Sequence, residues 1–189
     1  MAWKNGGGMT SEIVIEPPGA GLNDFDWRLS MARLDAPGPF SSFPGVDRLL
    51  LALEGQIDLT IEGRLTSLTP ADPAVHFAGE ATASADLPRS SAGGFQRALD
   101  FNAMVRRGKT SAHLSRLRFQ RAARVTVREG VAVVLSRTSA MNAETVNSHA
   151  TLELNDAIVI RCSQPQQLSF SSLGPGELVI CELRVQGPR

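Results

Sequence analysis

The sequence is short of the residues from which metal sites and nucleophilic sites are built. Its 189 residues include only three histidines and two cysteines. The histidines stand far apart and form no His-x-His pair: they are His76, His113 and His149. We therefore expect no metal site, and redox or dioxygenase chemistry is disfavoured. Cys162 and Cys181 lie in apolar runs, where a thiolate is disfavoured, and no Gly-x-Ser-x-Gly motif is present. We expect the two thiols to be reduced and part of a core.

The chain also lacks an excess of charge of either sign and lacks long apolar runs. Nineteen basic and nineteen acidic side chains give a formal net charge of zero, which argues against a nucleic-acid partner. No apolar stretch reaches the roughly 18 residues of a membrane helix, and no apolar segment follows basic residues at the N-terminus. We therefore expect no membrane association, no signal peptide and a cytoplasmic, bacterial-type location.

Apolar and polar residues alternate along most of the sequence, which is typical of β-strands. Segment 27–34 places Trp27 and Leu29 on one face and Arg28 and Ser30 on the other. Comparable short runs occupy 56–63, 114–119, 131–136, 150–155, 157–162, 168–173 and 177–185. Turn-forming glycine, proline, asparagine and aspartate residues separate them, so the pattern predicts an all-β sandwich or barrel.

The two halves of the chain echo each other. In each half a strand ending in Leu leads through a polar turn, containing Asp72 or Asp156, into another apolar strand, and further strands follow. This order predicts a duplicated β-barrel unit with its join near 107–112. We expect units at 1–108 and 109–189 within one compact chain.

Three consecutive glycines, Gly6–Gly8, stand close to the start of the sequence. They lack the Gly-Lys-Ser/Thr ending of a P-loop and the G-x-G-x-x-G spacing of a dinucleotide fold, so a phosphate cradle is disfavoured. The alternatives are a tight loop that lets Trp3 fold back before the first strand and a loop at a pocket mouth that offers backbone N–H groups to an anion.

Arginine side chains suggest an anion site at one end of a barrel. Arg28, Arg48 and Arg106, with Ser30 and Asn102, could grip a carboxylate, since guanidinium groups bind carboxylates in bidentate fashion. The alternative is that these arginines are solvated or paired with nearby carboxylates: Asp47, Asp58 and Asp100.

Five motifs occur in order: "WKNGGGMTSEI", "FDWRLSMARL", "GPFSSFPGVDRLLLALEG", "FAGE" and "DFNAMVRRG". Together they resemble the HutD/Ves family, densely over 3–108 and thinly over 109–189. The resemblance implies a bicupin, that is, two jelly-roll-like cupin barrels in a small bacterial cytoplasmic protein. It also implies a regulatory role in histidine utilisation. The implied ligand is a small carboxylate metabolite of the urocanate or formylglutamate class, bound without a metal or other cofactor.

The resemblance implies a ligand pocket but no catalytic residues. The positions that match its motifs, and that we expect to contact the ligand, are Lys4, Asn5, Arg28, Ser30, Ser41, Phe43, Arg48, Phe77, Asn102, Met104 and Arg106.

Two other functions stay open, although binding without catalysis is our expectation. A metal-free enzyme acting on such a metabolite would need a general acid or base inside the pocket, for which His76 and Asp47 are the candidates. A stress-related or interaction scaffold would instead have barrels packed with apolar side chains and no cavity. A homodimer would cover exposed edge strands.

Overall fold

The structure is a computed structural model of the chain, and it describes residues 1, 3 and 6–185. Strands and turns account for all of the regular structure in these residues. The contacts within the chain divide it into two compact units, Met1–Thr110 and Ser111–Arg189. The prediction of an all-β fold is therefore confirmed. No helix in residues 1, 3 and 6–185 is long and apolar enough to cross a membrane.

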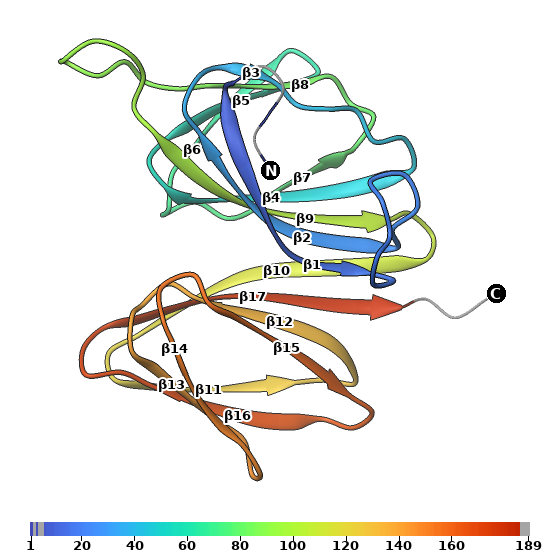
Figure 1. Ribbon diagram of the computed structural model, residues 1–189, viewed down its shortest axis with the longest axis vertical. Helices are drawn as coiled ribbons and strands as arrows, with labels where there is room; N and C mark the ends of the chain where they lie inside the picture. Colours follow the sequence, from blue (N-terminus) through green and yellow to red (C-terminus); the bar gives the residue numbers. More distant parts are fainter. Residues whose placement is uncertain (2, 4–5, 186–189) are drawn as a thin grey trace. The chain divides into compact units, whose positions relative to one another are not determined.

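The first unit is built from two antiparallel sheets (Figure 1). Its strands are β1 (Gly8–Glu16), β2 (Trp27–Leu34), β3 (Gly38–Pro39), β4 (Val46–Glu54), β5 (Ile57–Ile61), β6 (Arg64–Leu68), β7 (Val75–Ala78), β8 (Ala83–Asp86) and β9 (Ala98–Arg106). One sheet has the order β1-β2-β9-β4-β7, and the other has the order β3-β8-β5-β6.

The second unit also contains two antiparallel sheets. Its strands are β10 (Thr110–Phe119), β11 (Ala122–Val127), β12 (Gly130–Ser136), β13 (Met141–Glu144), β14 (His149–Leu152), β15 (Ala157–Cys162), β16 (Gln166–Ser171) and β17 (Gly176–Val185). The sheet orders are β10-β17-β12-β15 and β11-β16-β13-β14.

The two units repeat one strand order. Moving eight strands along the chain converts β2-β9-β4-β7 into β10-β17-β12-β15, and converts β3-β8-β5-β6 into β11-β16-β13-β14. Strand β1 is an addition at the edge of the first unit, where it pairs with β2. The duplicated pattern inferred from the sequence is thus present strand for strand.

The alternation of apolar and polar residues predicted the bounds of several strands closely. Segments 27–34 and 157–162 coincide with β2 and β15, and 177–185 differs from β17 by one residue. The segment 150–155 extends past β14 because the chain turns at Asn155, which has a positive φ of 71°. The short strands β11 and β13 were missed, since their sequences, AARVTV and MNAE, contain few large apolar side chains that would mark an alternation.

Each unit has its own apolar core between its sheets. The core of the first unit contains Ala32, Leu34, Leu50, Ala52, Ile57, Leu59, Leu68, Phe77, Ala83, Ala85, Leu87 and Ala98. The core of the second unit contains Val125, Val127, Ala132, Val134, Met141, Ala143, Leu152, Cys162, Leu168, Phe170, Leu178 and Ile180. Cys162 and Cys181 are buried free thiols, and burial raises the pKa of Cys181 to about 12.

The triple glycine forms a tight loop before β1, as one of the two favoured interpretations predicted. The N–H of Trp3 donates to the Gly8 carbonyl at 2.9 Å, and the N–H of Gly6 donates to the Trp3 carbonyl at 3.0 Å. Gly6 has a φ of 70°. A Cβ atom on Gly8 would lie 2.3 Å from the Arg33 carbonyl oxygen and 3.2 Å from the Trp3 ring. The backbone and the indole therefore leave room only for glycine at this position.

Replacing Gly8 by Ala should destabilise the protein, because the new methyl group would overlap a backbone oxygen that cannot move independently. We expect a loss of about 1–3 kcal/mol in the free energy of unfolding, measured by urea denaturation. Gly174→Ala is the matched control, since nothing lies within 4 Å of a Cβ at Gly174. Equal stability of the two variants would contradict the tight-loop geometry.

Candidate functional site

The first unit contains a cavity of about 590 Å³, a volume typical of small-molecule sites. It is lined by Met1, Trp3, Thr10, Leu22, Arg28, Ser30, Ala32, Pro39, Phe40, Ser41, Phe43, Arg48, Asn102 and Met104. Most of these side chains are apolar or weakly polar. The charged side chains in the lining are those of two arginines, Arg28 and Arg48.

Strand register brings the polar lining together. In the sheet β1-β2-β9-β4-β7, strand β9 lies between β2 and β4 and pairs with both. The pairing creates three successive cross-strand rows: Arg28–Met104–Arg48, Ser30–Asn102–Leu50 and Ala32–Asp100–Ala52. Because side chains alternate between faces, all three rows face the interior of the unit. The interior therefore passes from a cationic row to a neutral polar row and then to a row in which Asp100 stands between two alanines.

Arg48 is buried among aromatic rings. The residue is 3% exposed, and its guanidinium carbon lies 4.8, 5.1 and 5.9 Å from the ring centroids of Phe40, Phe77 and Phe43. Such cation–π contacts gain strength when they are desolvated. Its Nη1 donates to the Ser41 carbonyl at 3.4 Å, whereas the buried Nε has no hydrogen-bond acceptor in the part of the chain that the structure describes.

Electrostatics leave Arg48 charged at neutral pH. Burial lowers the pKa of Arg48 to about 10, the negative charge of Asp100 opposes this shift, and Arg28 adds to it. A guanidinium with this pKa is almost fully protonated at pH 7. The cavity therefore contains a buried cation whose polar groups are only partly satisfied.

Arg28 contributes a second cation to the cavity. Its Nε donates to Glu12 at 2.7 Å, and its Nη1 donates to Ser30 Oγ at 3.3 Å. The Arg28 side chain is 10% exposed and that of Glu12 is 43% exposed. The ion pair thus joins the cavity lining to the more accessible strand β1.

Asp100 lies behind the lining, in the third interior row. It is fully buried, and neither carboxylate oxygen makes a hydrogen bond of regular geometry among the described residues. Burial raises the pKa of Asp100 to about 7, while the charge of Arg48 and the nearby backbone amide of Ala32 oppose the shift. Asn102 lies on the same face, one position nearer the cavity. Its buried Oδ1 also has no hydrogen-bond donor among the described residues.

The structure brings together most of the residues expected in the pocket. Seven of them line the cavity: Arg28, Ser30, Ser41, Phe43, Arg48, Asn102 and Met104. Phe77 belongs to the apolar core and reaches the site indirectly, through its contact with Arg48. Lys4 and Asn5 lie outside the described residues.

The expectation that Arg106 lines the pocket is wrong. Its Nη2 donates to the carbonyls of Asn23 and Phe25 at 2.9 and 3.2 Å, and its guanidinium stacks over the Phe25 ring at 5.5 Å. Arg106 ends β9, and the loop before β2 offers it carbonyl acceptors there. Arg106 therefore fastens a loop instead of facing the cavity.

Neither candidate for a general acid or base lies in the cavity lining. Asp47 alternates with Arg48 onto the opposite face of β4, where it forms an ion pair with Arg107 at 2.8 Å. His76 is exposed on β7 and pairs in register with Leu49, which also lies on the face away from the cavity. The structure thus does not bring these two side chains to the site.

Sequence reasoning missed several contributors to the site. Trp3 lines the cavity and its Nε1 donates to Thr10 Oγ1 at 2.8 Å, which places the glycine loop beside the pocket. Phe40 stacks on Arg48 from the loop after β3. Asp100 was considered only as a possible partner of an arginine. Extending the face of Asn102 and Met104 by one more alternate position would have identified it.

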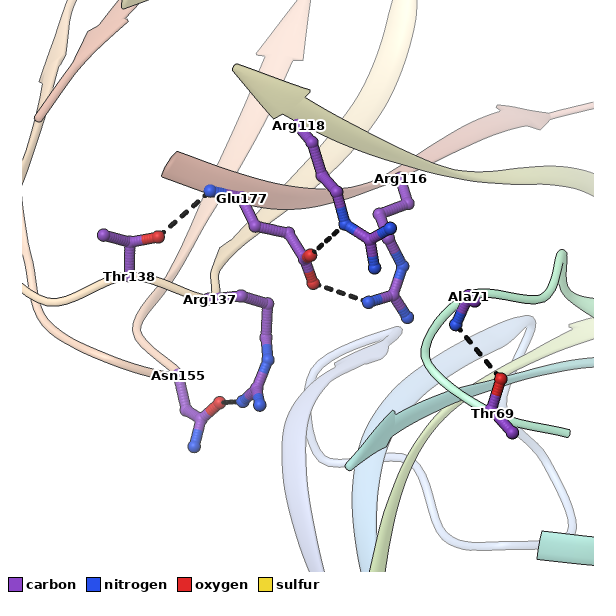
Figure 2. Close-up of polar contacts among 8 residues, drawn as sticks. All are labelled: Thr69, Ala71, Arg116, Arg118, Arg137, Thr138, Asn155 and Glu177. Atoms are coloured by element: carbon purple, nitrogen blue, oxygen red, sulfur yellow. Dashed lines mark hydrogen bonds and ion pairs between the residues drawn. The ribbon is translucent and has the colours of Figure 1, made fainter. Parts of the chain in front are cut away.

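The second unit has a polar cluster of a different kind (Figure 2). Glu177 accepts hydrogen bonds from Arg116 and Arg118 at 2.5 and 2.6 Å, and its backbone N–H donates to Thr138 at 3.0 Å. Arg137 donates to Asn155 nearby. Figure 2 also shows a separate turn of the first unit, in which the Ala71 N–H donates to Thr69 Oγ1 at 3.3 Å. In the Glu177 cluster one carboxylate accepts hydrogen bonds from two guanidinium groups.

No group of three or more His, Cys, Asp or Glu residues could hold a metal ion in the part of the chain that the structure describes. The donors near the cavity are two guanidiniums, hydroxyls and an amide, which suit an anion better than a cation.

Fold and cavity together define a protein with two cupin-type barrels, the first of which contains an arginine-lined cavity. A cupin 2 conserved barrel domain protein from Leptotrichia buccalis has this fold, with a TM-score of 0.62 and 9% identity over 94% of this chain and 89% of that one. The chain belongs to the HutD family, which it matches over residues 1–180. The predictions of a bicupin fold and of this family are confirmed.

Relatives and a solved structure agree with this assignment. An uncharacterised 21.2 kDa protein from the hutC 3′ region of Pseudomonas putida is 43% identical over 89 residues, which is 46% of each chain. The protein Ves of Citrobacter koseri is 37% identical over 112 residues, or 58% of this chain and 54% of that one. The chain thus spans about half the length of the curated relatives it matches. The structure of HutD from Pseudomonas fluorescens SBW25 has a TM-score of 0.78 and 27% identity, with 99% of this chain and 94% of that one covered.

Asp100→Asn should remove a pH dependence of stability. Because burial raises the pKa of Asp100 from 3.8 to about 7, the folded protein holds this proton more tightly than the unfolded chain does. The associated stability is complete below about pH 4 and is lost as the pH rises through 7. Relative to Asp100→Asn, the free energy of unfolding of the wild type should fall by about 2–3 kcal/mol between pH 5 and 8, as measured by urea denaturation.

Asp58→Asn serves as the control for this experiment. Hydrogen bonds from Ser67 and Gln56 lower the pKa of Asp58, so this carboxylate is ionised in both states over the same pH range. Its replacement should shift stability by an amount independent of pH. A parallel pH dependence in the wild type and in Asp100→Asn would contradict the assignment to Asp100.

Proposed function

We propose that the cavity of the first unit binds a small organic anion through a carboxylate group. The supporting observation is the pair of buried guanidiniums, Arg28 and Arg48, in an otherwise weakly polar cavity of about 590 Å³. A carboxylate placed between them would accept charge-assisted hydrogen bonds, including from the buried Nε of Arg48 that now lacks an acceptor.

The lining also supports a ligand with an apolar or planar body. Trp3, Leu22, Phe40, Phe43 and Met104 surround the cations. Flat and apolar ligand atoms would pack against these side chains while the carboxylate is held by the arginines. The family membership and the hutC-region relative point to a metabolite of histidine utilisation, of the urocanate or formylglutamate class. We propose a regulatory role, in which occupancy reports the level of that metabolite.

Binding is favoured over catalysis by the composition of the lining. Among the described residues that line the cavity, none is Asp, Glu, His, Cys or Lys, so proton transfer at the ligand would have no side chain at hand. A pure scaffold is disfavoured by the cavity itself, since a barrel packed with apolar side chains would leave no such space in the first unit. A role as a metabolite-binding protein therefore accounts best for the first unit.

Carboxylate binding should stabilise the fold and depend on both arginines. A ligand that binds only the folded state raises Tm as its concentration rises. We expect urocanate or formylglutamate to do this in a thermal-shift titration. Arg28→Met and Arg48→Met keep much of the side-chain volume and remove the charge. Each should weaken binding about tenfold to a hundredfold by calorimetry, the range expected for a charge-assisted hydrogen bond.

Arg33→Met is the matched control, because Arg33 lies on the same strand as Arg28 but bonds to Asp35 outside the cavity. Its ligand affinity should equal that of the wild type. A thermal shift with a divalent metal ion and with no carboxylate would overturn the proposal, and so would unchanged affinity in both Arg28→Met and Arg48→Met.

A further inference from the structure

Two cations and two carboxylates in and beside the interior of the first unit are arranged unequally. Arg28 is buried and forms a direct ion pair at 2.7 Å with Glu12, whose side chain is 43% exposed. Arg48 and Asp100 attract each other without a direct hydrogen bond: among the described residues Arg48 Nε has no acceptor, and the Asp100 oxygens have only the nearby Ala32 amide, which does not reach regular hydrogen-bond geometry. With Asp100 ionised, these four groups have no net charge. The second pair is thus balanced in charge but unsatisfied in hydrogen bonding.

Apart from Arg48, the described neighbours of Asp100 are mainly apolar. Ala32 and Ala52 flank it in its own row, and the facing sheet contributes apolar core residues such as Ile57 and Leu59. Among the described residues, the charged side chains on the interior face of the neighbouring strands are Arg28 on β2, paired with Glu12 on β1, and Arg48 on β4. The ionisation of Asp100 therefore depends first on its burial and then on the charge of Arg48 and the backbone amide of Ala32.

We propose that the first unit takes up its organic anion together with one proton, and that Asp100 is the group that accepts the proton. The inference rests on the proposed function, because it concerns the same cavity and the same arginines. It adds a determinant of specificity: Asp100 sets how much negative charge the interior accepts at a given pH.

The physical reason is competition for Arg48. A ligand carboxylate beside Arg48 would bring a second negative charge toward the ionised Asp100, in a medium of low polarity where like charges repel strongly. Protonation of Asp100 removes that repulsion without moving the backbone and leaves the attraction of Arg48 to the ligand. Because burial raises the pKa of Asp100 to about 7, a small further rise is enough for this change at neutral pH.

The pH dependence of affinity tests the proposal. Formylglutamate and hexanoate are suitable probes, since carboxyl groups of this type stay ionised between pH 6 and 9. If only the protonated form of Asp100 binds, the apparent Kd should rise about tenfold from pH 6 to pH 8 and about tenfold again to pH 9. Calorimetry in two buffers of different ionisation enthalpy should show the uptake of nearly one proton per ligand at pH 8.

Two variants separate Asp100 from other titrating groups. Asp100→Asn should bind at pH 8 about as tightly as the wild type does at pH 6, with no proton uptake. Asp58→Asn, on the outer side of the same unit, should bind the ligand with the same pH dependence of affinity as the wild type. A pH dependence that persists unchanged in Asp100→Asn would overturn the proposal.

A readout on the wild type avoids reliance on the folding of Asp100→Asn. The ¹³Cγ resonance of Asp100 should titrate near pH 7 in the free protein and move to the protonated position when formylglutamate is bound at pH 8. If formylglutamate and hexanoate bind but the resonance stays at its ionised position, the proton inference fails and the proposed function stands. If the resonance titrates near pH 7 and no carboxylate binds, the proposed function fails and this inference fails with it.

Discussion

The buried charge of Arg48 is the constraint on which the interior of the first unit depends. Burying an unpaired ion costs several kcal/mol, and a distant or imperfect partner recovers only part of that cost. Here the compensation is divided among three phenylalanine rings, one backbone carbonyl and the charge of Asp100. Each contribution is partial, and among the described residues Arg48 Nε has no hydrogen-bond acceptor.

Much of the fold could be predicted because alternation is a local property of the chain. Strand β2 was located residue for residue, and the duplication was visible in the order of strands and turns. The same rule placed Asn102 and Met104 on one face of β9, and both line the cavity. It failed for Arg106, since alternation gives the face of a residue but not the direction a long side chain takes at a strand end. The carbonyls of the loop before β2 determine the position of the Arg106 side chain.

Other parts of the site depend on contacts that no local pattern reveals. Phe40 follows a two-residue strand, and Trp3 reaches the cavity only because the glycine loop folds it back. Asp100 shows a different limit. Its position on the cavity face was predictable, but its raised pKa follows from burial that outweighs the charge of Arg48 and the Ala32 amide, and burial is a property of the packed interior.

The second unit shows that this strand order does not require a polar interior. Its equivalent strands enclose Ala132, Val134, Leu178 and Ile180, and Glu177 binds two arginines in its ion-pair cluster. An apolar core is often as stable as one with buried ions of similar volume, or more stable. The first unit keeps two guanidiniums, an amide and a carboxyl group inside the same framework. Buried charged and polar groups in a core are expected where a protein has a functional site. The two units share a fold, so it is the difference between their interiors that favours a function in the first unit.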